Sequence, residues 1–204
     1  MVYEKLTAAN FRVKYKDFFH LKKLYIMVHE WLVEFGWYSQ VGFKARDYSN
    51  WPEWFYLQRE SQKRGTELWA WWRLEKTIEG VSYWRWKMDI NWHGILIKDT
   101  QVMHKGVKFD TNWGVIEVAV KAEVVADPDG EWAKHWLLKN VNDLFRGVIF
   151  KNEMQRHKLE LYREAYRLQE AIKSYLALKT YLPEPEAEAH FYPTFGIGES
   201  EGIR

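Results

Sequence analysis

The sequence predicts an α+β fold: an N-terminal helix, an antiparallel β-meander of about five to six strands, and a long C-terminal helix packed on one face of the sheet. Three observations favour it. Apolar residues recur every three or four positions in 17–35, alternating segments fill 53–125, and a helical pattern follows "DPDG" to about Leu182. The 204 residues suit one domain, which we assign to 1–182, with an extended or disordered tail over 183–204.

Composition excludes several classes of protein. The chain has no cysteine, which rules out disulfides, thiolate nucleophiles and cysteine-containing metal sites. No apolar run approaches the ~18 residues that span a bilayer, and the first residues lack a signal-peptide pattern, so we expect a cytoplasmic protein without a membrane span. A net charge of +2 is too small to indicate nucleic-acid binding by itself. The unusual feature is an aromatic content of 18%, including 13 tryptophans.

The N-terminal elements follow from two periods. Residues 10–16 alternate apolar and basic side chains, which is typical of a strand. Asp17 is a candidate N-cap for a helix that continues to about Phe35, and Gly36 is placed to end it. The apolar stripe of that helix consists of Phe18, Leu21, Tyr25, Val28, Leu32 and Phe35.

Glycine-containing breaks divide the central region into candidate strands. These are 53–61, 66–76, 81–93, 95–103, 107–109 and 113–125. The C-terminal helix, expected over about 133–181, has its clearest apolar stripe at Leu161, Ala165, Leu168, Ile172, Tyr175 and Leu176.

Strand 81–93 has two distinct faces. Its even positions are apolar and include Trp84, Trp86 and Trp92, so we expect these indoles in the core beneath the helices. Its odd positions are mostly polar, so Asp89 and His93 should be more exposed. A register slip of one residue would exchange the two faces completely.

Strand 66–76 places Trp69 and Trp71 on the same face as charged residues. If it pairs with 81–93, these indoles share that face with basic side chains, either as cation–π stabilisation of an exposed surface or as a recognition surface. On the C-terminal helix two tyrosines lie beside the apolar stripe, where core packing is the alternative to binding. The candidates for ligand or partner binding are Trp69, Trp71, Tyr83, Arg85, Lys87, Tyr162 and Tyr166.

Candidates for chemistry are weak. Asp89, Asn91 and His93 project from one strand face and are weak acid–base or metal candidates. A neighbouring strand would have to complete the site, for which Asp99 and His104 are the candidates, and a solvated strand face is the favoured explanation of these residues. The "HEWLVE" segment lacks the second histidine of a zinc helix, and no Gly-x-Ser-x-Gly motif is present. We therefore assign no catalytic residue, no metal ligand and no cofactor.

By element order, the chain is similar to the helix-grip arrangement of lipid-transfer and polyketide-cyclase-type domains. The similarity implies a curved sheet around the last helix, with a cavity between the even-face aromatics and residues 155–178; bulky indoles filling that space are the alternative. We expect a non-enzymatic binding or protein-interaction module that self-associates or holds an apolar small molecule between sheet and helix.

Two other functions stay open. A cavity enzyme of the helix-grip type would need a convergent acid–base pair inside the aromatic pocket. A nucleic-acid-binding protein would need Arg73, Arg85, Lys87 and the arginines of the C-terminal helix on one continuous surface.

Overall fold

The computed structural model describes residues 5–39, 52–61, 65–78, 81–104, 107–128, 130 and 138–180, so the predicted tail over 183–204 lies outside the described residues. The elements, in chain order, are β1 (Lys5–Phe19), α1 (Leu21–Glu34), β2 (Tyr38–Ser39), β3 (Glu53–Ser61), β4 (Gly65–Ile78), β5 (Val81–His104), β6 (Val107–Ala126) and α3 (Leu138–Thr180).

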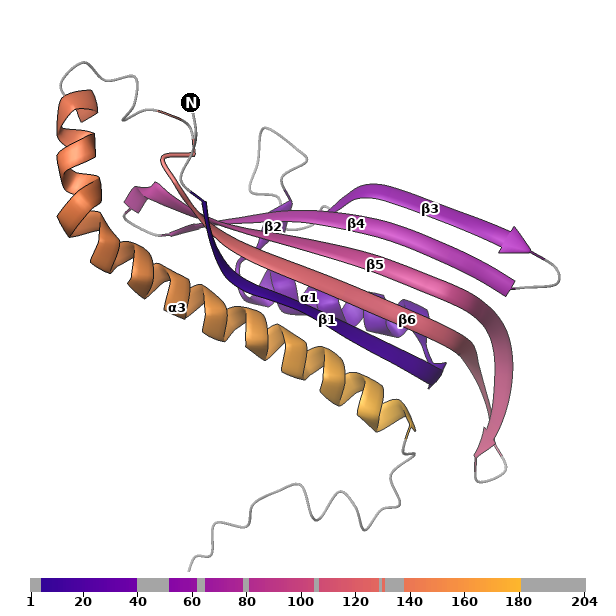
Figure 1. Cartoon of the computed structure of the whole chain (residues 1–204). Coiled ribbons are helices and arrows are strands. Elements are labelled where there is room, and N and C mark those ends of the chain that lie inside the picture. The colour runs from indigo at the N-terminus through magenta and orange to yellow at the C-terminus, as the bar shows by residue number, and fades with distance from the viewer. Residues whose placement is uncertain are drawn as a thin grey trace, which may run out of the picture.

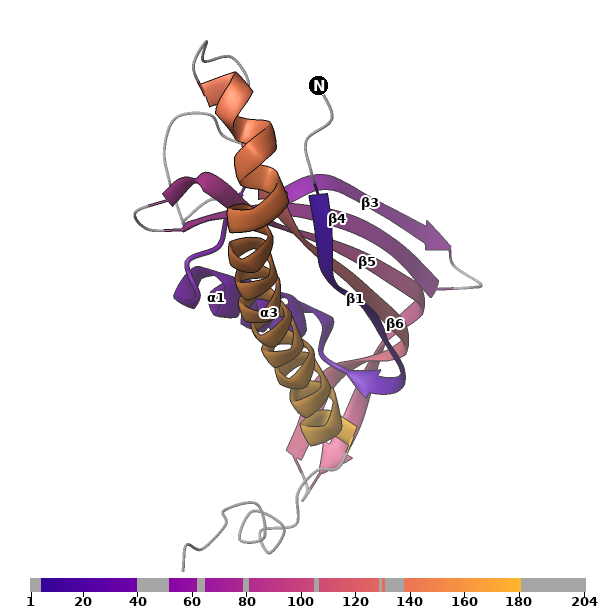
Figure 2. The same cartoon turned by 60° about the vertical axis from the view of Figure 1, so that its left-hand side comes forward.

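The strands form one antiparallel sheet in the order β1-β6-β5-β4-β2, with β3 also paired to β4. Both helices lie on the same side of this curved sheet, and β1 and β3 lie at opposite edges (Figures 1 and 2). The predicted α+β class, with a long C-terminal helix on one sheet face, is confirmed. Below, the face covered by the helices is called the inner face and the opposite one the outer face.

The hydrophobic core lies between the inner face and the two helices. Trp84, Trp86 and Trp92 are 4%, 6% and 1% exposed, so the predicted face assignment of β5 is confirmed. The Asp89 side chain on the other face is 38% exposed. The helices contribute apolar stripes to it, and the predicted members that are fully buried are Val28, Leu32, Leu161, Ala165, Leu168 and Ile172. Leu24 is fully buried although it was not predicted for the stripe, whereas Phe18, which was predicted for it, lies in β1 and is 38% exposed.

The predicted start of the first helix is wrong. β1 continues to Phe19, and His20 is the N-cap, accepting a hydrogen bond from the Lys23 backbone N–H. Asp17 instead accepts from the Phe18 N–H. The reason is that β6 pairs with β1 along its whole length, and this ladder outweighs a local capping signal. The predicted end is confirmed, since Gly36 takes a positive φ of 74° after the last turn.

The expected breaks at Gly94 and before residue 113 are also wrong, because β5 and β6 continue through them. A β-bulge between Ile95 and Lys98 bends the sheet, with Leu96 at a φ of 55°. A Cβ on Gly94 would lie 2.5 Å from Ile97 Cδ1, and one on Gly114 would lie 2.9 Å from Ile97 Cα. These glycines therefore make room for a bend within long strands.

In the part of the chain that the structure describes, no helix is both long enough and apolar enough to cross a membrane.

Candidate interaction surface on the outer face of the sheet

Trp69 and Trp71 lie side by side on the outer face of β4. Opposite residues of antiparallel strands share a face, so the pairing register identifies their neighbours. Trp69 is opposite Leu57 in β3 and His93 in β5. Trp71 is opposite Phe55 in β3 and Asn91 in β5. The two indoles are thus covered by neither helix.

Ring contacts join these side chains into one cluster. The Trp71 ring lies 4.6 Å from that of Phe55 and is stacked on Trp54, with centroids 6.0 Å apart and planes 14° from parallel. Trp69 is stacked on His93 at 5.2 Å. Trp54 is 60% exposed and Phe55 36% exposed. We call this set the outer-face cluster; its members are Trp54, Phe55, Leu57, Trp69, Trp71 and His93.

The guanidinium groups of two arginines lie over rings of the cluster. The guanidinium of Arg59 lies 5.8 Å from the Trp69 centroid, and that of Arg73 lies 5.8 Å from the Trp71 centroid. Both distances are in the range of cation–π attraction. The sequence prediction that aromatic and basic side chains share this face is therefore confirmed, with Arg59 and Arg73 as the cations in contact.

Arg73 also binds two of the acid–base candidates, Asp89 and Asn91. Arg73 donates to Asn91 Oδ1 at 2.9 Å, and its Nε lies 3.6 Å from Asp89 Oδ1. His93 is held in the stack on Trp69. Asp99 belongs to the other face, because it accepts from Asn112, which in turn accepts from the first N–H of α1. Among the described residues no group of three His, Asp or Glu side chains is placed to hold a metal ion.

Three predicted binding residues lie away from the cluster, toward the other end of β5. Arg85 and Lys87 share the outer face and form ion pairs with Glu75, at 3.4 and 2.8 Å. Tyr83 is only 4% exposed and packs edge-on against Trp84, so its ring is not available to a partner. These residues lie on the predicted strand. They do not join the cluster, because Arg85 and Lys87 bind Glu75 and the Tyr83 ring is buried.

The two candidate tyrosines on α3 belong to a different surface. Tyr166 packs on Phe11 of β1 at 5.5 Å, and Tyr162 packs on Tyr166 at 4.4 Å. Tyr162 is 43% exposed. Because α3 covers the inner face, the sheet separates both rings from the outer-face cluster (Figure 2). The structure does not bring these two groups of candidates together.

Large side chains occupy part of the space between the sheet and α3 where the helix-grip similarity implies a cavity. The carboxylate of Glu164 on α3 accepts from Lys76 Nζ at 2.7 and 2.9 Å and from Trp37 Nε1 at 2.6 Å. His157, 3% exposed, packs against Trp84 and Trp86. Burial lowers the pKa of His157, and its Nδ1 lies 3.6 Å from Glu160, beyond hydrogen-bond distance. At these positions the indoles fill the space.

A pocket of about 450 Å³ lies between the start of α1 and the inner side of β3. Its polar centre is Tyr25, whose hydroxyl donates to the Glu53 carboxylate and accepts from Trp72 Nε1 at 2.7 Å. Burial, together with the hydrogen bond to Glu53, raises the pKa of Tyr25 far above its usual range. The remaining lining is Leu21, Lys22, Ile26, Tyr56 and Leu68. Tyr25 therefore ties α1 to β3 and β4 in its protonated form.

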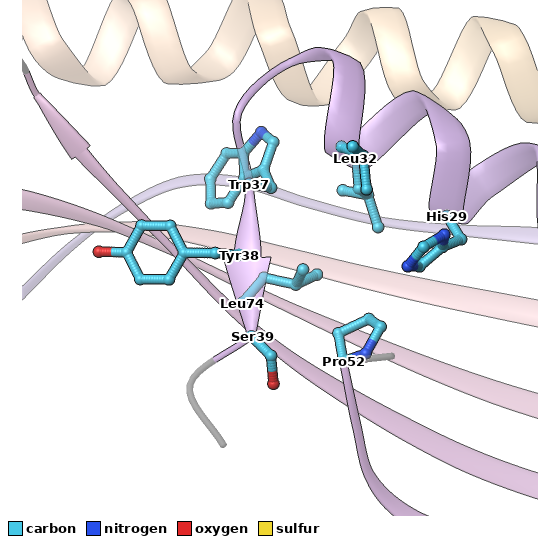
Figure 3. A pocket seen from close by; sticks show the side chains of 8 residues that line it. His29, Leu32, Trp37, Tyr38, Ser39, Pro52 and Leu74 are labelled. Atoms are coloured by element: carbon cyan, nitrogen blue, oxygen red, sulfur yellow. The ribbon is translucent and has the colours of Figure 1, made fainter. Parts of the chain in front are cut away.

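The end of α1 packs closely on the strands that follow it. Figure 3 shows His29 and Leu32 of α1 facing Leu74 of β4, with Trp37 and Pro52 beside them. The space left between them is about 10 Å³, roughly the room that one water needs. Burial lowers the pKa of His29. His29 is thus a partly buried residue of the helix, which agrees with the prediction that "HEWLVE" is not a zinc-binding helix.

Four contributors to the surface were missed by the sequence reasoning: Trp54, Phe55, Leu57 and Arg59. All lie in β3, whose bounds were predicted but whose faces show no clean alternation. The short "QKRG" connection could have indicated that this strand forms a hairpin with the next one. A hairpin closed over it places Leu57 and Phe55 opposite Trp69 and Trp71, as the register has it.

No model of a known protein family matches this chain, and a search of curated proteins finds no match to it.

Proposed function

We propose that this chain is a non-enzymatic protein-interaction module that self-associates through the outer-face cluster. The observation that carries the proposal is the exposure of Trp54 and Phe55, at 60% and 36%, over the stacked ring of Trp71 at one edge of the sheet. A set of contiguous large apolar side chains on a protein surface indicates a binding site.

The composition of the cluster favours a protein partner. Tryptophan, phenylalanine and arginine are enriched where proteins bind one another, and a few such residues supply most of the binding energy. The rings of Trp69 and Trp71 already contact His93 and Phe55, so ordering them on association costs little additional entropy.

The partner that these side chains suit is a second copy of the chain. The surface carries exposed rings and also the guanidinium groups of Arg59 and Arg73. When two copies are related by a two-fold axis, the rings of each copy can meet the guanidinium groups of the other, so the surface is complementary to itself. No other residue type has to be supplied by the partner.

The other functions have less support. Nucleic-acid binding was expected to need a continuous basic surface, but Arg85 and Lys87 are paired with Glu75 on the outer face, whereas α3 lies on the inner face. An enzyme needs a convergent acid–base pair, and the Glu53 carboxylate in the pocket beside α1 is bonded to a phenol that stays protonated. That pocket remains the better place for an apolar small molecule.

Sedimentation velocity over a concentration series tests the proposal. We expect concentration-dependent association of the wild-type chain and at least a tenfold weaker association of Trp54→Ala, since interface aromatics commonly contribute ~2 kcal/mol. Trp113→Ala is the matched control, because Trp113 is 36% exposed on the outer face of β6, two strands away from β4. A wild-type chain that stays monomeric, or equal effects of both substitutions, would contradict the proposal.

A further inference from the structure

We infer that the second copy docks edge to edge, with β3 pairing antiparallel to β3 of the other chain around a two-fold axis at Leu57. This inference rests on the proposed self-association and specifies its geometry. It is carried by two observations: β3 has an edge that no described strand pairs with, and its sequence is complementary to itself when reversed.

The first observation concerns the edge. In the part of the chain that the structure describes, β3 pairs with β4 alone, so its other edge presents backbone N–H and C=O groups. Seven of its nine residues are exposed, and Glu53 and Leu57 are half-buried. Such an edge is a template for another strand unless proline, lysine or a bulge protects it. Here Pro52 and the bulge between Glu53 and Phe55 affect only the beginning of the strand.

The second observation concerns the order of side chains in β3, "EWFYLQRES". Leu57 is its central residue, so an antiparallel pair centred there matches the regular part of the strand, Phe55 to Arg59, with its own equivalent, and any other register aligns fewer residues. On the outer face, Phe55 then meets Arg59 of the second copy, and Leu57 meets its own equivalent. On the inner face, Tyr56 meets Gln58 of the second copy.

Each of these pairs is favourable. Phe55 and Arg59 form a cation–π pair on either side of the axis, and the central leucines make an apolar contact. A parallel arrangement would place Arg59 opposite its own equivalent, and like charges directly opposite destabilise a sheet. A shift of one residue would set outer-face side chains against inner-face ones.

The arrangement also explains why the outer-face cluster lies at this edge. Leu57 is opposite Trp69, and Phe55 is opposite Trp71, in the register with β4. Joining two β3 strands therefore brings the two clusters together into one aromatic band across a continuous sheet. The pairing covers the exposed edge and brings Phe55 and Leu57, the cluster members on that edge strand, into contact with the second copy.

A single cysteine tests the register, because the natural chain contains none. Opposite residues of an antiparallel pair have Cβ atoms ~5 Å apart, close to the separation that a disulfide spans. Leu57→Cys should therefore cross-link to itself under mild oxidation. Ser61→Cys is the control on the same strand, at a position more exposed than Leu57. Its equivalents would be eight residues apart along the strands, about 26 Å, and should not cross-link.

Charge substitution at the axis gives an independent readout. Leu57→Lys and Leu57→Glu chains should each stay monomeric at concentrations where the wild type associates, and an equimolar mixture should form a heterodimer. Only a residue on the two-fold axis meets itself, so rescue by mixing identifies Leu57 as that residue. Circular dichroism of each variant checks that its sheet is intact.

The outcomes separate the two proposals. Cross-linking of Leu57→Cys above Ser61→Cys, together with rescue by mixing, supports the edge-to-edge dimer. If Trp54→Ala weakens association but Leu57→Cys cross-links no better than Ser61→Cys, the edge geometry is overturned and the interaction function stands. If the wild-type chain sediments as a monomer throughout, both are overturned.

Discussion

The ion pair between Lys76 and Glu164 connects the sheet to the long helix, and removing its carboxylate should destabilise the fold. Glu164 is 12% exposed and binds Lys76 Nζ at 2.7 Å and Trp37 Nε1 at 2.6 Å. The ammonium also lies 5.7 Å from the Trp37 ring and 5.3 Å from the Trp86 ring. A Glu164→Ala chain therefore keeps a poorly hydrated cation and an indole N–H that have both lost their acceptor.

The expected loss follows from that geometry. Breaking a buried ion pair costs ~3–5 kcal/mol, and because Lys76 keeps 24% exposure and two ring contacts we expect the lower end, about 3 kcal/mol. The double variant Lys76→Met with Glu164→Leu leaves no unpaired charge. It should cost only ~1–2 kcal/mol, mainly through the unpaired Trp37 N–H.

Equilibrium urea unfolding of the wild type, Glu164→Ala, the single variants Lys76→Met and Glu164→Leu, and the double variant measures this coupling. We expect the double variant to be more stable than Glu164→Ala alone. A cost of Glu164→Ala below about 0.5 kcal/mol, or effects that simply add in the double variant, would refute the reasoning.

Three further predictions concern the core. Trp86→Ala should lower the free energy of unfolding by roughly 3–5 kcal/mol in urea, since a buried indole is removed; an effect below about 0.5 kcal/mol would place it on the surface. Gly114→Ala should destabilise the chain more than Gly94→Ala in the same assay. The new Cβ at position 114 would meet backbone atoms around Ile97, whereas the new Cβ at position 94 would first meet the side-chain Cδ1 of Ile97, which can move. The reverse order of stability would contradict this packing. Burial lowers the pKa of His157 below its ordinary value of 6.5, so just below that pH the unfolded chain binds a proton that the folded chain does not. The free energy of unfolding should therefore decrease as the pH falls through 6.5. His157→Leu should make this pH dependence shallower, and an unchanged pH profile of the variant would contradict the reasoning.

The sequence predicted most of the sheet because one face of it is buried. The alternation in β5 identified Trp84, Trp86 and Trp92 as core residues, and burial on one side fixes such a register strongly. Local signals failed where tertiary pairing is stronger. Asp17 has the chemistry of an N-cap, yet the ladder between β1 and β6 extends past it. Gly94 marks a bend, since Ile97 packs over it, although glycine patterns alone do not distinguish a bend from a turn.

The candidate site was only half predictable. Trp69 and Trp71 stood out because two indoles among charged residues cannot face a core. Trp54 and Phe55 did not, because β3 carries apolar and polar side chains on both faces and its role depends on the neighbour it pairs with. Tyr83 was grouped with the basic residues by its odd position, but its ring is buried against Trp84.

Hydrogen–deuterium exchange of the wild-type chain, compared at concentrations below and above association, tests the interaction surface most directly. Backbone amides of β3 should exchange more slowly in the associated state, because the edge that no described strand covers becomes hydrogen-bonded. Amides of β1, the strand at the opposite edge of the sheet, should exchange at the same rate in both. Unchanged exchange in β3, or protection confined to β1 or α3, would contradict self-association through the β3 edge.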